Sequence, residues 1–166
     1  MRLEPPQEAV KRGSEEPADH ALGRSRGGLT TKIHLVCDGH GHPLAFELSP
    51  GQHADSRWFT TVMERVHLPG SVGRPVKRCD DIVADKGYDS DALRRYGDRY
   101  SMKPVIATRK MHRRPHRGRR RGFDKARYRQ RNIVERLFGW MKEMRRLGTR
   151  YDKLASSFRA MVSLAC

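Results

Sequence analysis

The chain has 166 residues, of which 36% are hydrophobic and 33% charged, and its formal net charge is +16. This length allows one domain with a modest core. No run of about 18 apolar residues is present to span a membrane, and no apolar segment follows Met1 as in a signal peptide. The charge favours a polyanionic partner, nucleic acid first, although composition alone fits a small RNA-binding protein at least as well as an enzyme.

Three widely spaced cysteines are present, and none of them lies in a CxxC pair. We therefore expect free thiols in a reducing cytoplasm, without disulfides and without a zinc site.

The N-terminal segment is interrupted by prolines and shows no apolar period, so residues 1–22 are predicted to be disordered. One domain is predicted over residues 23–166. It begins with a flexible, glycine-rich and basic stretch that contains Arg24 and Arg26.

Residues 30–48 have the pattern of a β-hairpin. Ile33, Leu35 and Cys37 alternate with polar residues, as in a half-buried strand. Asp38-Gly39 is a reversal signal, and a second alternating segment follows at 44–48.

Shorter elements follow the hairpin. A helix is predicted over residues 56–66, and a brief buried strand over 81–84 ends at Asp85. Residues 86–88 form the exit turn, and Asp89 or Ser90 can cap the next helix. Residues 104–107 are predicted to form another strand.

The strongest local bias is a basic run. Residues 109–131 hold twelve Lys or Arg and one acid, Asp124. Such a block repels itself and buries little apolar surface, so a basic insertion is predicted at about 109–124. Its physical use is to neutralise phosphates.

The last long element is predicted to be one helix over residues 125–147. Its core-facing stripe would contain Ile133, Leu137, Trp140, Met144 and Leu147. The opposite face would carry Tyr128, Arg131, Glu135 and Lys142, and Gly139 would let another backbone approach closely. A plain alternative is a solvated helix face on which Glu135 pairs with Arg131.

Three separated blocks together resemble the DDE transposases of bacterial insertion sequences, in the insertion-sequence-five group. The spacing Tyr128-x2-Arg131-x3-Glu135-x6-Lys142 is similar to the signature of these enzymes. Residues 83–89, VADKGYD, resemble their second acidic block, and residues 23–34 with 51–56 resemble their hairpin region. The blocks occur in the family's order, and the resemblance covers about residues 20–166.

The resemblance implies an α/β fold, an RNase H-like mixed sheet flanked by helices, and a two-metal Mg²⁺ site held by three carboxylates. Asp85 would be the second catalytic carboxylate and metal ligand, and Glu135 the third. The implied reaction is phosphodiester hydrolysis at transposon ends, followed by strand transfer into target DNA. The implied DNA-binding residues are Tyr128, Arg131, Lys142, Arg24, Arg26, Arg113, Arg114, Arg117, Arg119, Arg120 and Arg121.

One part of the family's pattern is not found. The first catalytic aspartate belongs on a first strand upstream of the hairpin, and neither Asp19 nor Asp38 suits that role. We therefore expect a sheet without its first strand. We also expect a chain that neither cleaves DNA nor binds Mg²⁺ tightly alone, and an exposed hairpin edge that lowers stability or drives association.

The expected partners are transposon ends, target DNA and either an upstream frame product or a second copy of the chain, in a cytoplasmic, nucleoid-associated setting without a membrane. Two alternatives remain open. The chain is a non-catalytic DNA-binding remnant, or an unrelated basic RNA-binding protein that shows no response to metal. A nuclease of the same fold is a weaker third alternative.

Overall fold

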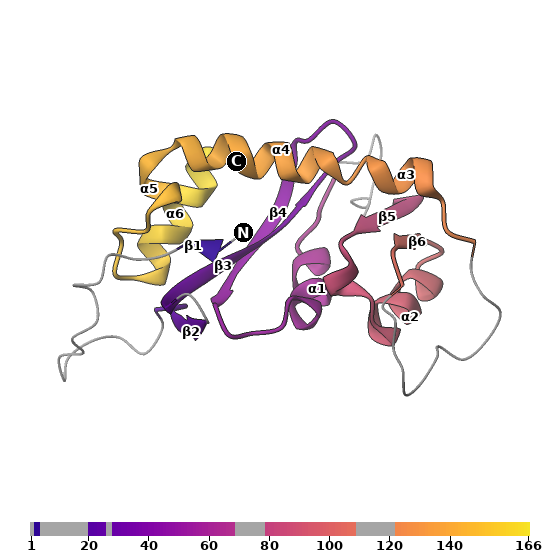
Figure 1. Cartoon of the computed structure of the whole chain (residues 1–166), viewed down its shortest axis with the longest axis horizontal. Helices are drawn as coiled ribbons and strands as arrows, with labels where there is room; N and C mark the ends of the chain where they lie inside the picture. The colour runs from indigo at the N-terminus through magenta and orange to yellow at the C-terminus, as the bar shows by residue number, and fades with distance from the viewer. Residues whose placement is uncertain (1, 4–19, 26–27, 69–78, 109–121) are drawn as a thin grey trace.

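The computed structural model describes residues 2–3, 20–25, 28–68, 79–108 and 122–166 (Figure 1). Its longest feature is an antiparallel hairpin formed by β3 (Gly28–Cys37) and β4 (Pro43–Pro50). Ile33 pairs with Leu48, and His34 pairs with Glu47. The turn is closed by the Asp38 carboxylate, which accepts hydrogen bonds from the backbone N–H groups of His40 and His42 at 2.8 and 2.9 Å. The predicted hairpin is confirmed.

The other strands form short pairs. β1 (Arg2–Leu3) and β2 (Gly23–Ser25) both pair antiparallel with β3. β5 (Asp81–Ala84) and β6 (Lys103–Ile106) form a separate parallel pair. The described part of the chain thus has a mixed α/β architecture with two sheets, a four-stranded antiparallel one and a two-stranded parallel one. Within the segment predicted to be disordered, residues 4–19 lie outside the described residues.

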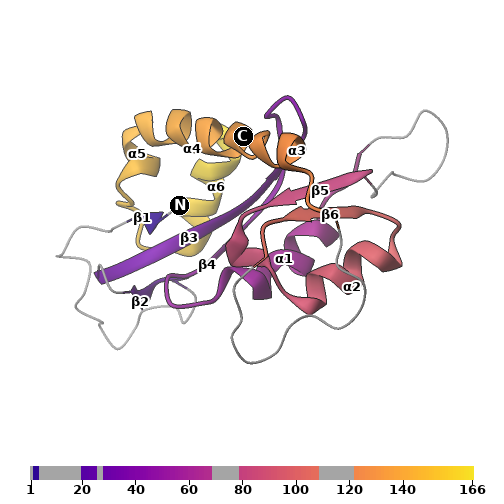
Figure 2. The same cartoon turned by 45° about the vertical axis from the view of Figure 1, so that its right-hand side comes forward.

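The middle of the chain forms a second layer (Figure 2). It contains α1 (Asp55–Glu64), the 3-10 turn η2 (Lys86–Tyr88) and α2 (Asp91–Arg99). Ser90 caps α2 by accepting a hydrogen bond from the Leu93 N–H, as one of the two predicted caps. Phe59 and Met63 of α1 pack with Ile82 of β5 in one apolar core, against which Val36 of β3 also packs. This core therefore joins one face of the hairpin to the parallel pair.

The C-terminal region contains four helices: α3 (Lys125–Arg129), α4 (Asn132–Glu143), α5 (Arg145–Gly148) and α6 (Ala155–Ala165). The prediction of one helix over 125–147 is wrong. Between α3 and α4 the chain tightens. The backbone N–H group donates to the carbonyl three residues earlier at four positions: Gln130, Arg131, Ile133 and Val134. Met144 has an extended backbone, with ψ 107°, and ends α4.

These breaks change which residues face the core. Met141 is fully buried and Leu147 is 1% exposed, and both pack with Ile33, Leu48 and Phe158. Trp140, predicted to face the core, is 50% exposed. Within α4 the buried side follows Leu137 and Met141, four residues apart, and leaves Trp140 beside it in solvent.

The hairpin consequently lies between two cores. Ile33 belongs to the core under α4 and α6, whereas Val36 packs against the core under α1. Side chains of a strand alternate between its faces, so residues three apart point to opposite sides.

A buried arginine connects the C-terminal region to the hairpin. Arg150 is 1% exposed, and its guanidinium donates to the carbonyls of Asp152 and Lys153 at 2.9 and 3.1 Å. It also donates to the Thr31 hydroxyl, and it lies over the Phe158 ring at 4.9 Å. These contacts satisfy a charge that would be costly to bury alone.

Among the described residues, no helix has the length and apolar character that crossing a membrane requires.

Candidate active site

Asp85 lies where the sequence places it, directly after the last residue of β5. Its Oδ1 atom accepts a hydrogen bond from the Lys86 N–H at 2.7 Å and thereby caps the turn η2. Asp85 is exposed, whereas Ile82 of the preceding strand is buried. The strand is therefore anchored in the core and presents the carboxylate at the surface.

Glu135 lies in the first turn of α4, with a side chain 54% exposed. Its Oε1 atom is 2.8 Å from Nη1 of Arg131, and the Arg131 guanidinium lies 5.7 Å from the centre of the Tyr128 ring. Arg131 thus contacts both Tyr128 and Glu135. Three of the four residues predicted to share one face lie together, despite the break between α3 and α4.

Lys142, the fourth residue of that face, is exposed near the end of α4. It follows Glu135 by seven residues, or about two helical turns, so both side chains lie on the same side of this helix. The ion pair between Arg131 and Glu135 is the one that the plain alternative predicted. An exposed pair of this kind contributes about 0.5 kcal/mol or less to stability.

The helix that precedes α4 contacts the strand that leads to Asp85. α3 packs against β5 and β6, as Figures 1 and 2 both show. An ion pair of 2.6 Å between Arg127 and Asp81 joins α3 to the first residue of β5. The helical segment leading to Glu135 is therefore fixed to the strand leading to Asp85.

The other predicted DNA-binding residues are not all brought to this place. Arg24 is exposed on β2, at the far end of β3 from the hairpin turn (Figure 1). Arg26 and the predicted contacts of the basic run lie outside the described residues: Arg113, Arg114, Arg117, Arg119, Arg120 and Arg121.

The surroundings of Gly139 in α4 differ from the predicted ones, and a close approach of backbone is found at Gly148 in α5. Outside its own helix, no atom of the described residues lies within 4 Å of a Cβ placed on Gly139, so the predicted close approach of another backbone is not found in this part of the chain. Close approach occurs instead at Gly148, where a Cβ would lie 2.7 Å from the Lys142 carbonyl oxygen. The break after α4 folds the chain back on itself at this point.

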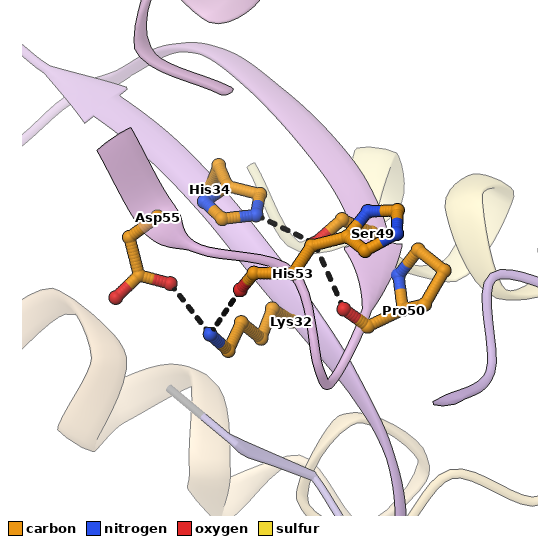
Figure 3. A network of polar contacts seen from close by, with 6 residues as sticks. All are labelled: Lys32, His34, Ser49, Pro50, His53 and Asp55. Atoms are coloured by element: carbon orange, nitrogen blue, oxygen red, sulfur yellow. Dashed lines mark hydrogen bonds and ion pairs between the residues drawn. The ribbon is translucent and has the colours of Figure 1, made fainter. Parts of the chain in front are cut away.

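A second polar cluster, for which no role was predicted, joins β3 to the start of α1 (Figure 3). Nζ of Lys32 donates to the His53 carbonyl at 2.6 Å and to Oδ1 of Asp55 at 2.8 Å. The Lys32 side chain is 13% exposed and that of Asp55 is 42% exposed. In the sequence Lys32 and His34 are on the polar face of the alternating strand, and the structure covers this face with α1.

His34 completes this cluster as a buried, neutral imidazole. Its ring stacks on Trp58 at 5.6 Å between centroids, and Nε2 lies 2.7 Å from the Ser49 hydroxyl. Burial lowers the pKa of His34 from 6.5 to about 4, with Lys32 acting in the same direction. The Trp58 ring also stacks on His53, at 6.0 Å, so the loop before α1 is braced against β3.

No three His, Cys, Asp or Glu side chains within the described ranges gather closely enough to hold a metal ion. Asp85 and Glu135 are thus two exposed carboxylates, one after β5 and one on the helix that follows α3, without a third ligand group among the described residues.

The chain is similar to known proteins over most of its length. A family model described as a transposase DDE domain matches residues 3–166. The chain is 30% identical over 155 residues to a Burkholderia cepacia protein that carries the name of transposase for insertion sequence element IS402; the match covers 93% of this chain and 68% of that protein. It is 28% identical over 138 residues to a Brucella ovis protein with the corresponding name for element IS6501, covering 83% and 95% of the two chains. No solved structure matches the chain significantly.

Proposed function

Since the chain belongs to the transposase DDE domain family, we propose that it supplies the DNA-cleaving and strand-joining site of an insertion-sequence transposase. The observation that carries this proposal is the placement of Asp85 and Glu135. Both carboxylates are exposed, one at the end of a strand and the other on the helical segment fixed to that strand by Arg127 and Asp81.

We propose an RNase H-like arrangement for this fold. It is supported by the order of elements, an antiparallel hairpin followed by α1, a parallel strand pair and late helices. In such a sheet a further strand would lie between β3 and β5. Residues 33–37 of β3 pair with β4 alone among the described strands, and β5 pairs with β6 alone. Both strands therefore have an edge that a further strand can use.

The donor chemistry suits a hard divalent cation, because carboxylate oxygens are the ligands that Mg²⁺ prefers. Asp85 and Glu135 would hold the ion, with the third carboxylate contributed from outside the described residues. When bound, such an ion supplies electrostatic stabilisation of the charge on the phosphoryl oxygens.

The positively charged side chains near Glu135 would bind the phosphates of DNA. Arg131 is paired with one carboxylate and stacked on Tyr128, so its guanidinium is held in place to contact a backbone phosphate beside Glu135. Tyr128 would orient the DNA strand. Lys142 would contact a phosphate two helical turns away, and the basic run at 109–121 would bind backbone without reading sequence.

The direct test is cleavage of a labelled duplex that carries the element's terminal inverted repeat, with Mg²⁺ or Mn²⁺ present. The chain is assayed alone and together with the product of the upstream reading frame. We expect efficient nicking only in the mixture, and a loss of at least a hundredfold with Asp85→Asn or Glu135→Gln, in the range found when a group that stabilises the transition state is removed.

Glu143→Gln is the matched control. Glu143 is an exposed carboxylate on the same helix, so its replacement changes the net charge equally and should leave nicking within about twofold. Nicking that is unaffected by both active-site substitutions would refute the assignment. DNA binding without nicking in any mixture would favour the non-catalytic DNA-binding remnant.

We further propose that the working complex holds two DNA ends and so contains either two copies of this chain or one copy with an upstream product. The edge of β3 supports this proposal, because unpaired strand edges readily accept another strand. The mass of the complex on a terminal repeat, measured by light scattering, distinguishes the two compositions.

A further inference from the structure

The cluster around Lys32 and Asp55 connects the hairpin to the turn that carries Asp85. Lys32 is on β3, and Asp55 is in the first turn of α1. Their ion pair of 2.8 Å and the bond from Lys32 to the His53 carbonyl together fix the start of this helix to the strand (Figure 3).

α1 in turn packs against η2, the turn that Asp85 caps. Tyr88 of this turn packs against the core that contains Phe59 and Met63 of α1. The pKa of Tyr88 is raised, mainly by burial and then by the negative charges of Asp55 and Asp85. The phenol therefore lies within the electrostatic reach of both carboxylates.

The turn itself is short, with three residues, and is held in part by local hydrogen bonds. The Lys86 N–H is bonded to the Asp85 side chain, the Tyr88 N–H to the Asp85 carbonyl at 2.8 Å, and the Asp89 N–H to the Lys86 carbonyl at 3.2 Å. A three-residue 3-10 turn holds its shape mainly through what packs against it. Here α1 and its apolar core support the turn on one side, and the ion pair of the buried Asp89 with Arg94 of α2, 2.6 Å long, anchors its end.

We propose that Lys32 and Asp55 are positioning residues for Asp85. Their ion pair fixes the first turn of α1, and α1 fixes the turn that holds the Asp85 carboxylate in place. Neither residue touches DNA in this role. That this positioning serves DNA cleavage rests on the proposed function. The placement of the turn itself can be measured without any reaction.

The test is amide hydrogen exchange, followed by NMR on the full chain. We compare the parent with Lys32→Met, Asp55→Asn and the double variant. Each single variant should raise the exchange rates of the Lys86, Tyr88 and Asp89 amides by about fivefold, as expected for the loss of a partly buried ion pair. The double variant should raise them no further than Lys32→Met does, because Lys32 makes both contacts to the start of α1 and the Asp55 contact is one of them.

Two control variants separate positioning from general destabilisation. Arg146→Met removes a cation from the ion pair with Asp152, 3.2 Å long, on the α5–α6 side of the molecule, and should leave the turn's exchange unchanged. Lys32→Arg retains the positive charge and should restore slow exchange. If Lys32→Met does not fold, Asp55→Asn carries the test, because Asp55 is the more exposed partner.

Two results would overturn the proposal: equal acceleration of exchange across all strands, or an unchanged turn in both single variants. Nicking is measured on the same variants. Slower nicking with unchanged DNA affinity is expected if the proposed function also holds. If the unsubstituted chain nicks DNA in no mixture with the upstream product, the proposed function is refuted. The exchange result still decides whether Lys32 and Asp55 position the turn.

Discussion

Glu47 of β4 lies 2.6 Å from Nη2 of Arg159 on α6, 112 residues later in the chain. The same carboxylate forms an ion pair with Arg65, which follows α1. The Glu47 side chain is 4% exposed, whereas those of Arg65 and Arg159 are 58% and 39% exposed. One buried carboxylate thus joins the helices that cover the two faces of the hairpin.

We predict that Glu47→Gln lowers the free energy of unfolding by about 1–2 kcal/mol. This is less than the full cost of breaking a buried pair, because both arginines can regain water. Urea denaturation followed by circular dichroism measures the change. Glu143→Gln, at an exposed carboxylate, should change the free energy by less than about 0.5 kcal/mol; equal effects of the two variants would contradict the prediction.

The glycines at positions 139 and 148 should respond oppositely to alanine. Gly139→Ala places a methyl group in open space within a helix, so it should stabilise the protein by about 1 kcal/mol. Gly148→Ala brings Cβ to 2.7 Å from the Lys142 carbonyl oxygen, so it should destabilise the protein by about 1–3 kcal/mol. Thermal unfolding of the two variants in parallel tests the sign of each effect, and a stabilising Gly148→Ala would argue against the tight turn after α4.

Stability should fall on acidification because of His34. Its folded pKa of about 4 lies below the ordinary value of 6.5, so between these values the unfolded chain binds a proton that the folded chain excludes. This contribution is fully present above about pH 6.5 and declines as the pH falls toward 4, by at most about 1.4 kcal/mol per pH unit.

The measurement is urea denaturation at several pH values, with His34→Phe as the comparison. Phenylalanine retains an aromatic ring next to Trp58 but does not titrate. Asp55, Lys32 and Glu47 also influence His34 and are unchanged in the variant. A slope between pH 6.5 and 4 that is as steep in His34→Phe as in the parent would assign the effect to other groups.

The helix face beside Glu135 should contribute measurably to DNA affinity. Arg131→Ala and Lys142→Ala should each lower the slope of log affinity against log salt concentration by about 0.9, as for one phosphate contact. Arg99→Ala is the matched control, because Arg99 is exposed on α2, on the other side of the parallel strands from α3 (Figure 1). Fluorescence anisotropy at several salt concentrations gives the slopes, and an equal decrease for Arg99 would indicate a general charge effect.

The sequence by itself determined the local elements and the family. Alternation over residues 30–48 predicted the hairpin, and a short apolar run predicted β5 with Asp85 at its end; both are confirmed. The spacing of Tyr128, Arg131 and Glu135 resembles the transposase signature, and the family is confirmed. Arg131 contacts both other residues although α3 and α4 are separate helices.

Only the tertiary structure decided where helices end and which apolar residues they bury. A period of 3.6 residues cannot reveal the breaks after α3 and after α4. It also does not decide between neighbours within α4 such as Trp140, which is exposed, and Met141, which is buried. Contacts between distant segments are equally invisible in a local pattern, because they depend on how the elements pack. In the sequence Lys32 and Asp55 are two charged residues 23 positions apart. Packing of α1 on β3 brings their side chains to 2.8 Å from each other, and α1 also contacts the turn that carries Asp85.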